Sequence, residues 1–233
     1  MRVAAPPFIL MWVAILASGA TRLAPSQEFT PRALTPFAEV KAKTLIRERL
    51  PCLGCHQLDG EGGRLGPDLG ASSGTTAAFV YAMIRDPQRT RPGSAMPRIP
   101  MSPQTLELVV SYLVARRGSP AGGVTLPPAP AAAPRDTHAL YLTFCAGCHG
   151  TTGRGDGPNA KFLPVRPAVH TDATTMSQRS DDMLFDAVAA GGYVLGRSNR
   201  MPGFGATLTS AEIRGLVRYI RELCRCAGPA WAR

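Results

Sequence analysis

Two five-residue segments of the chain carry two thiols and an imidazole at identical spacing. Residues 52–56 read CLGCH and residues 145–149 read CAGCH, so both are C-x-x-C-H. From this composition, one such pentad is expected by chance about 0.003 times in a chain of 233 residues. Thiolates and imidazoles bind metal ions, and thiolates also form covalent bonds. Because the pattern occurs twice, it indicates a shared chemistry rather than coincidence.

This pattern is the attachment signature of c-type haem. On a turn of helix the two thiols reach the two vinyl groups of one porphyrin and form thioethers, while the adjacent imidazole is presented to the iron. A disulfide within each pair and a zinc site are the alternatives. Zinc requires four ligands in one domain, but the two segments lie 93 residues apart without further cysteines nearby. We therefore expect two covalently attached haem c groups with their iron, held by Cys52, Cys55, His56, Cys145, Cys148 and His149.

Two methionines that precede proline are the candidates for the sixth iron ligand. Met96 follows the first motif and Met201 the second, and each is directly followed by Pro. Met101 lies 11 residues before Tyr112, and Leu208 lies 11 residues before Tyr219. Met101 therefore corresponds to Leu208 of the second unit. Core filling is the alternative role for a methionine. We assign that role to Met101 and expect Met96 and Met201 to bind iron.

The elements that must position these residues recur in two similar units, which indicates an internal duplication. Each unit predicts a helix that leads into the motif, a Gly-rich loop, a second helix, a Met-Pro loop and a terminal helix. Thr35 and Pro36 are the cap and first residue expected of a helix, and Thr137 precedes a short run at 138–144. Strand signals are weak throughout, so the predicted fold class is all-α.

The later helices of the second unit have the clearest boundaries. Ser180 is expected to open the middle helix, and Gly191 with Gly192 to close it. Thr209 and Glu212 have the spacing of a capping box. Apolar residues then recur on one face of the terminal helix, at Ile213, Leu216, Val217, Ile220 and Leu223.

These units divide the chain into two small domains in tandem. We expect them at residues 36–117 and 137–226, joined by a Pro-, Ala- and Gly-rich linker at 118–136. Residues 1–20 combine a basic residue, an apolar run and small residues, as export signals do. Cleavage of this signal peptide and its retention as an anchor both stay open. Either way, the expected location is periplasmic or otherwise extracytoplasmic, with tethering to the membrane in the second case.

The charge of the chain bears on its partners. It carries 26 basic and 16 acidic residues for a net charge of +10, and 23 of the basic residues are arginines spread along the chain. This spread argues against a nucleic-acid-binding arm, so no nucleic acid partner is expected. A generally basic composition is one explanation, and a positive face that docks on acidic redox proteins is the other. Only 6% of the residues are aromatic, so haem would supply much of each small core.

With these motifs, residues 36–117 and 137–224 resemble tandem class I cytochromes c. The resemblance implies that the carbonyl of Pro67, in the segment Gly66-Pro67-Asp68-Leu69, accepts a hydrogen bond from the proximal His56. The second unit lacks this Leu, so the corresponding role is open among Pro158, Pro164 and Pro167. The resemblance also implies Met ligation before Pro, and packing of Tyr112 and Tyr219 in the terminal helices near the first helix of each unit.

Four residues fall outside this scheme. His170 is a competing ligand in principle, although a loop histidine is more often solvated or hydrogen bonded. His138 is expected at the surface. Cys224 and Cys226 are surplus to haem binding and could form a local disulfide, link to another chain or remain free, with the disulfide favoured over a free pair in an oxidising compartment.

His/Met ligation fills the coordination sphere of iron and favours electron transfer over ligand activation. The resemblance therefore implies a dihaem carrier that passes single electrons between periplasmic or membrane-bound redox partners. A cytochrome subunit of a larger respiratory or dehydrogenase complex is the main alternative. A haem enzyme and a haem sensor are less favoured. A peroxidase or a sensor needs an iron position that is open or can be opened, and a thiosulfate-oxidising cytochrome uses a Cys ligand, whereas the two Met-Pro loops predict a Met ligand at each iron. The chain is thus expected to be a carrier or subunit rather than an enzyme, with no catalytic residues.

Overall fold

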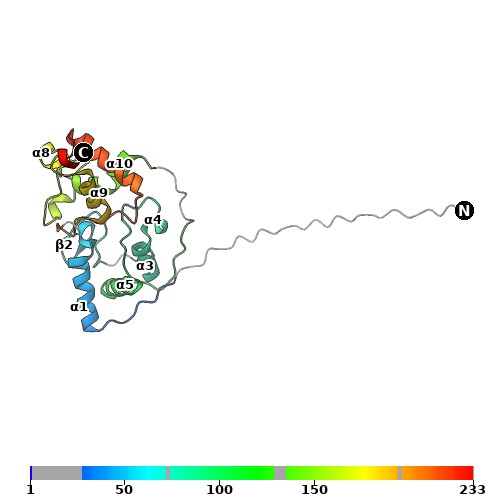
Figure 1. Cartoon of the computed structure of the whole chain (residues 1–233). Coiled ribbons are helices and arrows are strands. Elements are labelled where there is room, and N and C mark those ends of the chain that lie inside the picture. Colours follow the sequence, from blue (N-terminus) through cyan, green and yellow to red (C-terminus); the bar gives the residue numbers. More distant parts are fainter. Residues whose placement is uncertain (2–27, 72–73, 129–134, 194–195, 233) are drawn as a thin grey trace.

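The computed structural model describes residues 1, 28–71, 74–128, 135–193 and 196–232. Helices and loops make up almost all of this part of the chain (Figure 1). Its regular β structure is a two-stranded antiparallel hairpin, in which Gln57 pairs with Gly62 and Leu58 with Glu61. The expected signal peptide falls on residues that lie almost entirely outside the described ones. None of the helices in the described ranges has the length and apolar character that a membrane span requires.

The N-terminal half, residues 28–117, begins with a capped helix that leads into the first motif. The Thr35 hydroxyl accepts a hydrogen bond from Ala38 N at 3.3 Å, and Pro36 is the first helical residue, which confirms the predicted start. The elements of this half are α1 (Pro36–Thr44), a π-helical turn η1 (Leu45–Arg49), α2 (Cys52–Cys55), β1 (Gln57–Leu58), β2 (Glu61–Gly62), α3 (Ala77–Arg85), α4 (Pro87–Thr90) and α5 (Pro103–Arg117).

The C-terminal half, residues 135–232, again runs from a first helix and a motif turn through a middle helix to a long terminal helix, and its described residues contain no hairpin. Its elements are α6 (Thr137–Phe144), α7 (Ala146–His149), η2 (Ala160–Phe162), α8 (Ala173–Met176), α9 (Asp181–Ala190), α10 (Ser210–Cys224) and η4 (Ala230–Ala232). Asp136, rather than Thr137, caps α6, because its carboxylate accepts from Ala139 N at 2.8 Å. Ser180 and Gly191 bound α9, as predicted.

Helix α10 confirms the predicted capping box. The Thr209 hydroxyl accepts from Glu212 N, and the Glu212 carboxylate accepts from Thr209 N at 2.8 Å. The same carboxylate forms two hydrogen bonds with Arg135, whose guanidinium holds the pKa of Glu212 below its usual value. The start of α10 is thus tied to the segment that enters the C-terminal half.

Apolar side chains form separate clusters in the two halves. In the N-terminal half, Tyr112 of α5 packs with Ala42 and Ile46 of the first helical segment. In the C-terminal half, Tyr219 of α10 packs beside Tyr141 of α6, with ring centroids 5.0 Å apart. The expected packing of the terminal helix against the first helix is therefore present in both. Met101 packs against the cluster around Val110, which confirms that it is a packing residue.

The two surplus cysteines are joined to each other. Cys224 and Cys226 form a disulfide directly after α10, so of the three alternatives the structure shows the local one. Arg225 between them adopts a left-handed conformation with φ of 52°. Cys224 is buried in the cluster of Met176, Leu184, Val217 and Ile220. The disulfide thus fixes the chain where it leaves the terminal helix.

The lowered pKa of Glu212 predicts an acid-sensitive helix start. A carboxylate whose pKa is depressed by folding stabilises the protein above its ordinary value of 4.5, and this contribution is lost as the pH falls through the lowered pKa. Unfolding by denaturant, measured across this pH range, should show a smaller acid-induced loss of stability in Glu212→Gln than in the wild type. An equal loss in both proteins would show that the pairing with Arg135 contributes nothing measurable.

Candidate haem sites

The first motif presents its imidazole from the end of a single helical turn. Cys52 and Cys55 bound α2, and His56 follows in extended conformation. The His56 ring has its Nδ1 2.8 Å from the carbonyl oxygen of Pro67, which is the contact that the resemblance implies. Gly66 allows this approach, because a Cβ there would lie 2.3 Å from the His56 ring. The second ring nitrogen, Nε2, is therefore the one left to bind a metal.

The second motif holds its imidazole in the same way but with a different residue. His149 Nδ1 lies 2.9 Å from the carbonyl oxygen of Ala168. The expectation that Pro158, Pro164 or Pro167 would supply this carbonyl is wrong. The loop after α7 is longer than the loop after α2. The Gly153 carbonyl accepts a hydrogen bond from His170 N and so brings the end of this loop back beside the motif. The carbonyl that lies next to His149 is therefore that of Ala168, one residue after Pro167.

His170 lies against the histidine of the second motif. The rings of His149 and His170 are stacked, with centroids 4.2 Å apart and planes 14° from parallel. His170 Nδ1 is 3.0 Å from the Tyr141 hydroxyl, within hydrogen-bonding distance. The residue is buried rather than solvated, with 8% of its surface exposed. His170 therefore supports His149 from the side, whereas His138 is exposed as expected.

Burial sets the protonation of the histidines and cysteines around the two motifs. It lowers the pKa of both His56 and His149, and it lowers that of His170 to about 2. These imidazoles are therefore neutral near pH 7, which is the form that binds iron. Burial also raises the pKa of Cys145 to about 12, and in Cys55 the nearness of Cys148 adds to the effect of burial. These thiols are thus protonated in the folded chain.

Hydrogen bonds to the backbone of the methionine hold both Met-Pro loops. Met96 N donates to the Ser94 hydroxyl at 3.2 Å, and the Met96 carbonyl accepts from the Gln88 side chain. The Met201 carbonyl accepts from Gly192 N at 3.1 Å, directly after the end of α9. Both methionines are half-buried. A cavity of about 430 Å³ borders Met201 and is lined by residues of both halves.

The structure brings the two motifs close together. Asn159 Nδ2 donates to the Gly54 carbonyl at 2.7 Å and lies 3.4 Å from Cys148 Sγ. The Asn159 backbone N–H donates to the Gly147 carbonyl at 3.0 Å, so one residue joins the equivalent glycines of both motifs. Asn159 is 1% exposed. Nothing in the sequence pattern singled it out, because a lone asparagine in a loop has no local signature.

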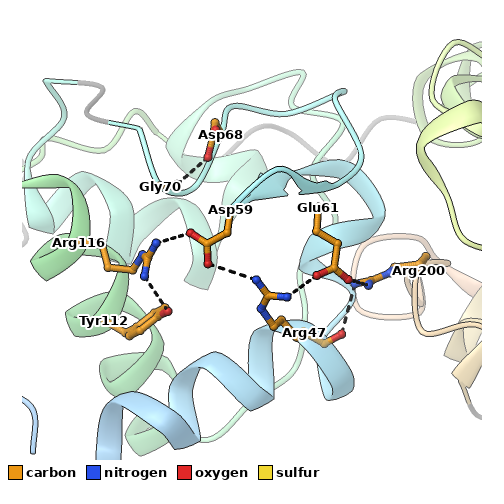
Figure 2. A network of polar contacts seen from close by, with 8 residues as sticks. All are labelled: Arg47, Asp59, Glu61, Asp68, Gly70, Tyr112, Arg116 and Arg200. Atoms are coloured by element: carbon orange, nitrogen blue, oxygen red, sulfur yellow. Dashed lines mark hydrogen bonds and ion pairs between the residues drawn. The ribbon is translucent and has the colours of Figure 1, made fainter. Parts of the chain in front are cut away.

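A chain of ion pairs adds a second connection between the halves (Figure 2). Arg200, directly before Met201, pairs with Glu61 at 2.9 Å and donates to the Arg47 carbonyl at 3.3 Å. Arg47 pairs with both Glu61 and Asp59, and Asp59 pairs with Arg116. Asp59 and Glu61 are presented by the hairpin, whose turn residue Asp59 has a φ of 54°. The Asp59-Gly60 dipeptide is a hairpin signal that could have located this turn in the sequence.

The donor set fits haem c in each half. The two cysteines of each motif lie in or directly before one helical turn, and the adjacent imidazole has one nitrogen anchored on a backbone carbonyl and the other available for iron. A structural zinc site takes four ligands, one more than the two cysteines and the histidine of a motif, and the described residues contain no group of three or more His, Cys, Asp and Glu arranged to hold a metal. The arrangement is therefore suited to a covalently held porphyrin.

Comparison with known families supports this chemistry for the second motif. Residues 132–220 match the family model described as cytochrome c oxidase, cbb3-type, subunit III. The chain contains a cytochrome c domain. This domain implies covalently bound haem c with iron, and it agrees with the helix-rich fold and with a role in electron transfer. The match covers the second motif and Met201, and it ends within α10.

Two solved structures are also similar to the chain. The KustC0563 c-type cytochrome is 27% identical, with 38% of this chain and 98% of that chain covered and a TM-score of 0.32. A reducing HAO-like protein complex of Kuenenia stuttgartiensis, Kustc0457/Kustc0458, is 20% identical, with 83% of this chain and 98% of that chain covered and a TM-score of 0.31. At these TM-scores neither superposition establishes how this chain is folded. A search of curated proteins found no match.

The contact between Tyr141 and His170 predicts a specific loss of stability in the cytochrome c domain. Tyr141→Phe removes the hydroxyl but keeps the ring, so the buried His170 loses its hydrogen-bonding partner at a cost of about 1–3 kcal/mol. Denaturant unfolding of the holoprotein measures this change. Tyr219→Phe is the matched control, because it removes a hydroxyl from the same aromatic cluster without touching His170. Equal stability of Tyr141→Phe and the wild type would contradict the prediction.

Proposed function

We propose that the chain is a dihaem c-type cytochrome that transfers single electrons between redox partners. The observation that carries the proposal is the repeated anchoring of the proximal imidazole. His56 and His149 each follow a C-x-x-C turn, and each has Nδ1 within 2.9 Å of a backbone carbonyl. This geometry leaves Nε2 of both rings for iron. It supports a first haem in the N-terminal half as well as a second in the cytochrome c domain.

The proposal includes two domains in tandem, at 36–117 and 137–226. Each has its own apolar cluster between its first and terminal helices, and each has a motif, a middle helix and a Met-Pro loop in the same order. Part of the linker between them, residues 129–134, lies outside the described ranges. This division agrees with a duplicated unit, because the order of elements is shared although the loops differ in length.

The proposed site residues have distinct roles. Cys52 and Cys55, with Cys145 and Cys148, hold the two haems covalently, and His56 and His149 are the proximal ligands. Met96 and Met201 are the sixth ligands, so that each iron is six-coordinate. Pro67 and Ala168 orient the proximal rings through their carbonyls. When bound, haem c supplies a one-electron couple, and a filled coordination sphere favours electron transfer over ligand activation.

The remaining parts of the proposal concern location and partners. Cytochrome c domains are typically extracytoplasmic, and an export signal at residues 1–20 agrees with a periplasmic location. The net charge of +10 favours docking onto redox proteins with acidic surfaces. Of the alternatives, a subunit of a larger complex has specific support, because the matching family is described as a subunit of a cbb3-type oxidase. Purification of the native chain together with an oxidase or dehydrogenase subunit would favour that second candidate, whereas a chain that purifies alone would favour the carrier.

Absorption spectra of the oxidised holoprotein test the ligation. The wild type should show the weak Met-to-ferric-iron band and bind no CO when reduced, because neither iron has an open position. Met96→Ala and Met201→Ala should each lose about half of the band and gain CO binding at one haem.

Met101→Leu is the matched control for these variants. Met101 is a packing residue in the same Met-Pro region, so its replacement should leave the band intact. A wild-type protein that binds CO at once, or that contains one haem per chain, would contradict the dihaem carrier and favour an enzyme or sensor.

A further inference from the structure

The contact between the two haem-attachment turns is unusually close and is made by one buried side chain. Asn159 lies in the loop after α7, directly before η2, and 1% of its surface is exposed. Its side-chain amide donates to the Gly54 carbonyl in the other half at 2.7 Å, and its side-chain oxygen accepts from Arg64 N at 2.7 Å. Both functional atoms of the amide are thus bonded to the N-terminal half.

The backbone of the same residue is bonded to its own half. Asn159 N–H donates to the Gly147 carbonyl, and Gly147 holds the same position in the second motif that Gly54 holds in the first. The amide nitrogen Nδ2 also lies 3.4 Å from Cys148 Sγ. The Asn159 Nδ2 atom therefore contacts both proposed haem sites. It lies beside the Cys148 sulfur, which would attach one haem, and it donates to the carbonyl of Gly54, the residue before Cys55, which would attach the other.

Glycine at both motif positions permits this approach. A Cβ on Gly54 would lie 1.9 Å from the Arg200 carbonyl oxygen, and a Cβ on Gly147 would lie 2.6 Å from the Leu65 side chain. A Cβ on Gly63 would lie 2.7 Å from the Asn159 amide. The Asn159 amide is therefore packed closely against the main chain at Gly63.

We propose that Asn159 is a positioning residue that clamps the two attachment turns together and thereby sets the rate of electron exchange between the two halves. This inference rests on the proposed dihaem function. In the exchange, one electron leaves the site of one half and enters the site of the other, so that one is oxidised as the other is reduced and no proton has to move. The clamp keeps the Cys148 sulfur and the main chain at Cys55 in contact through hydrogen bonds rather than through water.

Two variants of Asn159 separate its contacts. Asn159→Leu has a similar volume and loses all the side-chain hydrogen bonds. Asn159→Asp keeps an oxygen that can accept from Arg64 N but loses the donor to the Gly54 carbonyl and the contact with Cys148 Sγ. Thr207→Val is the matched control, because it removes another bond between the halves, from Arg98 N to the Thr207 hydroxyl at 2.8 Å, away from both turns.

The experiment measures electron exchange in the full-length holoprotein after flash reduction of one site. Haem content is counted first, and small-angle X-ray scattering of each variant reports the compactness of the chain independently of electron transfer. We expect Asn159→Leu and Asn159→Asp to slow the exchange several-fold with two haems retained, and Thr207→Val to exchange at the wild-type rate. The redox titration of one site should also depend less on the oxidation state of the other in both Asn159 variants.

Several outcomes would overturn the inference. Exchange at the wild-type rate in Asn159→Leu would do so, and if that variant does not fold, the same result in Asn159→Asp decides the question. Equal slowing in Thr207→Val would assign the effect to any bond between the halves rather than to the clamp. A single haem in the wild type would overturn the proposed function itself, and this result is seen before any variant is compared.

Discussion

Close packing of the two attachment turns constrains the rest of the chain. Gly54 meets the backbone of Arg200, and Gly147 meets the side chain of Leu65, at distances that leave no room for a Cβ. Protein interiors tolerate little change in volume, so the backbone of the neighbouring half requires the glycine at position 54, whereas the Leu65 side chain beside Gly147 is exposed and can move. The Met201 loop follows directly from Arg200. The position of a proposed ligand in one half therefore depends on the motif of the other.

Features that depend on neighbouring residues in the chain could be predicted from the sequence. The capped starts at Thr35 and Thr209, the end of α9 at Gly191 and the apolar face of α10 follow from local hydrogen bonding and from the helical period. The role of Met101 could be predicted as well, because a repeated unit gives each position a counterpart. The cap of α6 was missed by one residue, since Asp136 and Thr137 are both good capping residues and only the backbone conformation distinguishes them.

Features that depend on the path of a loop could not be predicted in the same way. A backbone carbonyl is present at every residue, so nothing in the side chains distinguishes Ala168 from the prolines beside it. The stacking of His170 on His149 has the same origin, because His170 lies 21 residues after His149 and the return of the chain between them is set by the hydrogen bonds to the Gly153 carbonyl. The contact of Asn159 with Gly54 spans 105 residues, and a lone asparagine carries no pattern that would reveal it.

The ion pairs and the Asn159 amide, two of the connections between the halves, differ in what they contribute. Glu61 has 46% of its side chain exposed, so water and salt screen its ion pair with Arg200, although only 9% of the Arg200 side chain is exposed. A buried amide behaves differently, since each of its polar atoms would be costly to leave unpaired. Asn159 satisfies both atoms only when the Gly54 carbonyl and Arg64 N–H are in place. The ion pairs can therefore tolerate small shifts of one half against the other. The Asn159 amide keeps both of its hydrogen bonds in only one relative position of the halves, and it fixes that position where the two attachment turns meet.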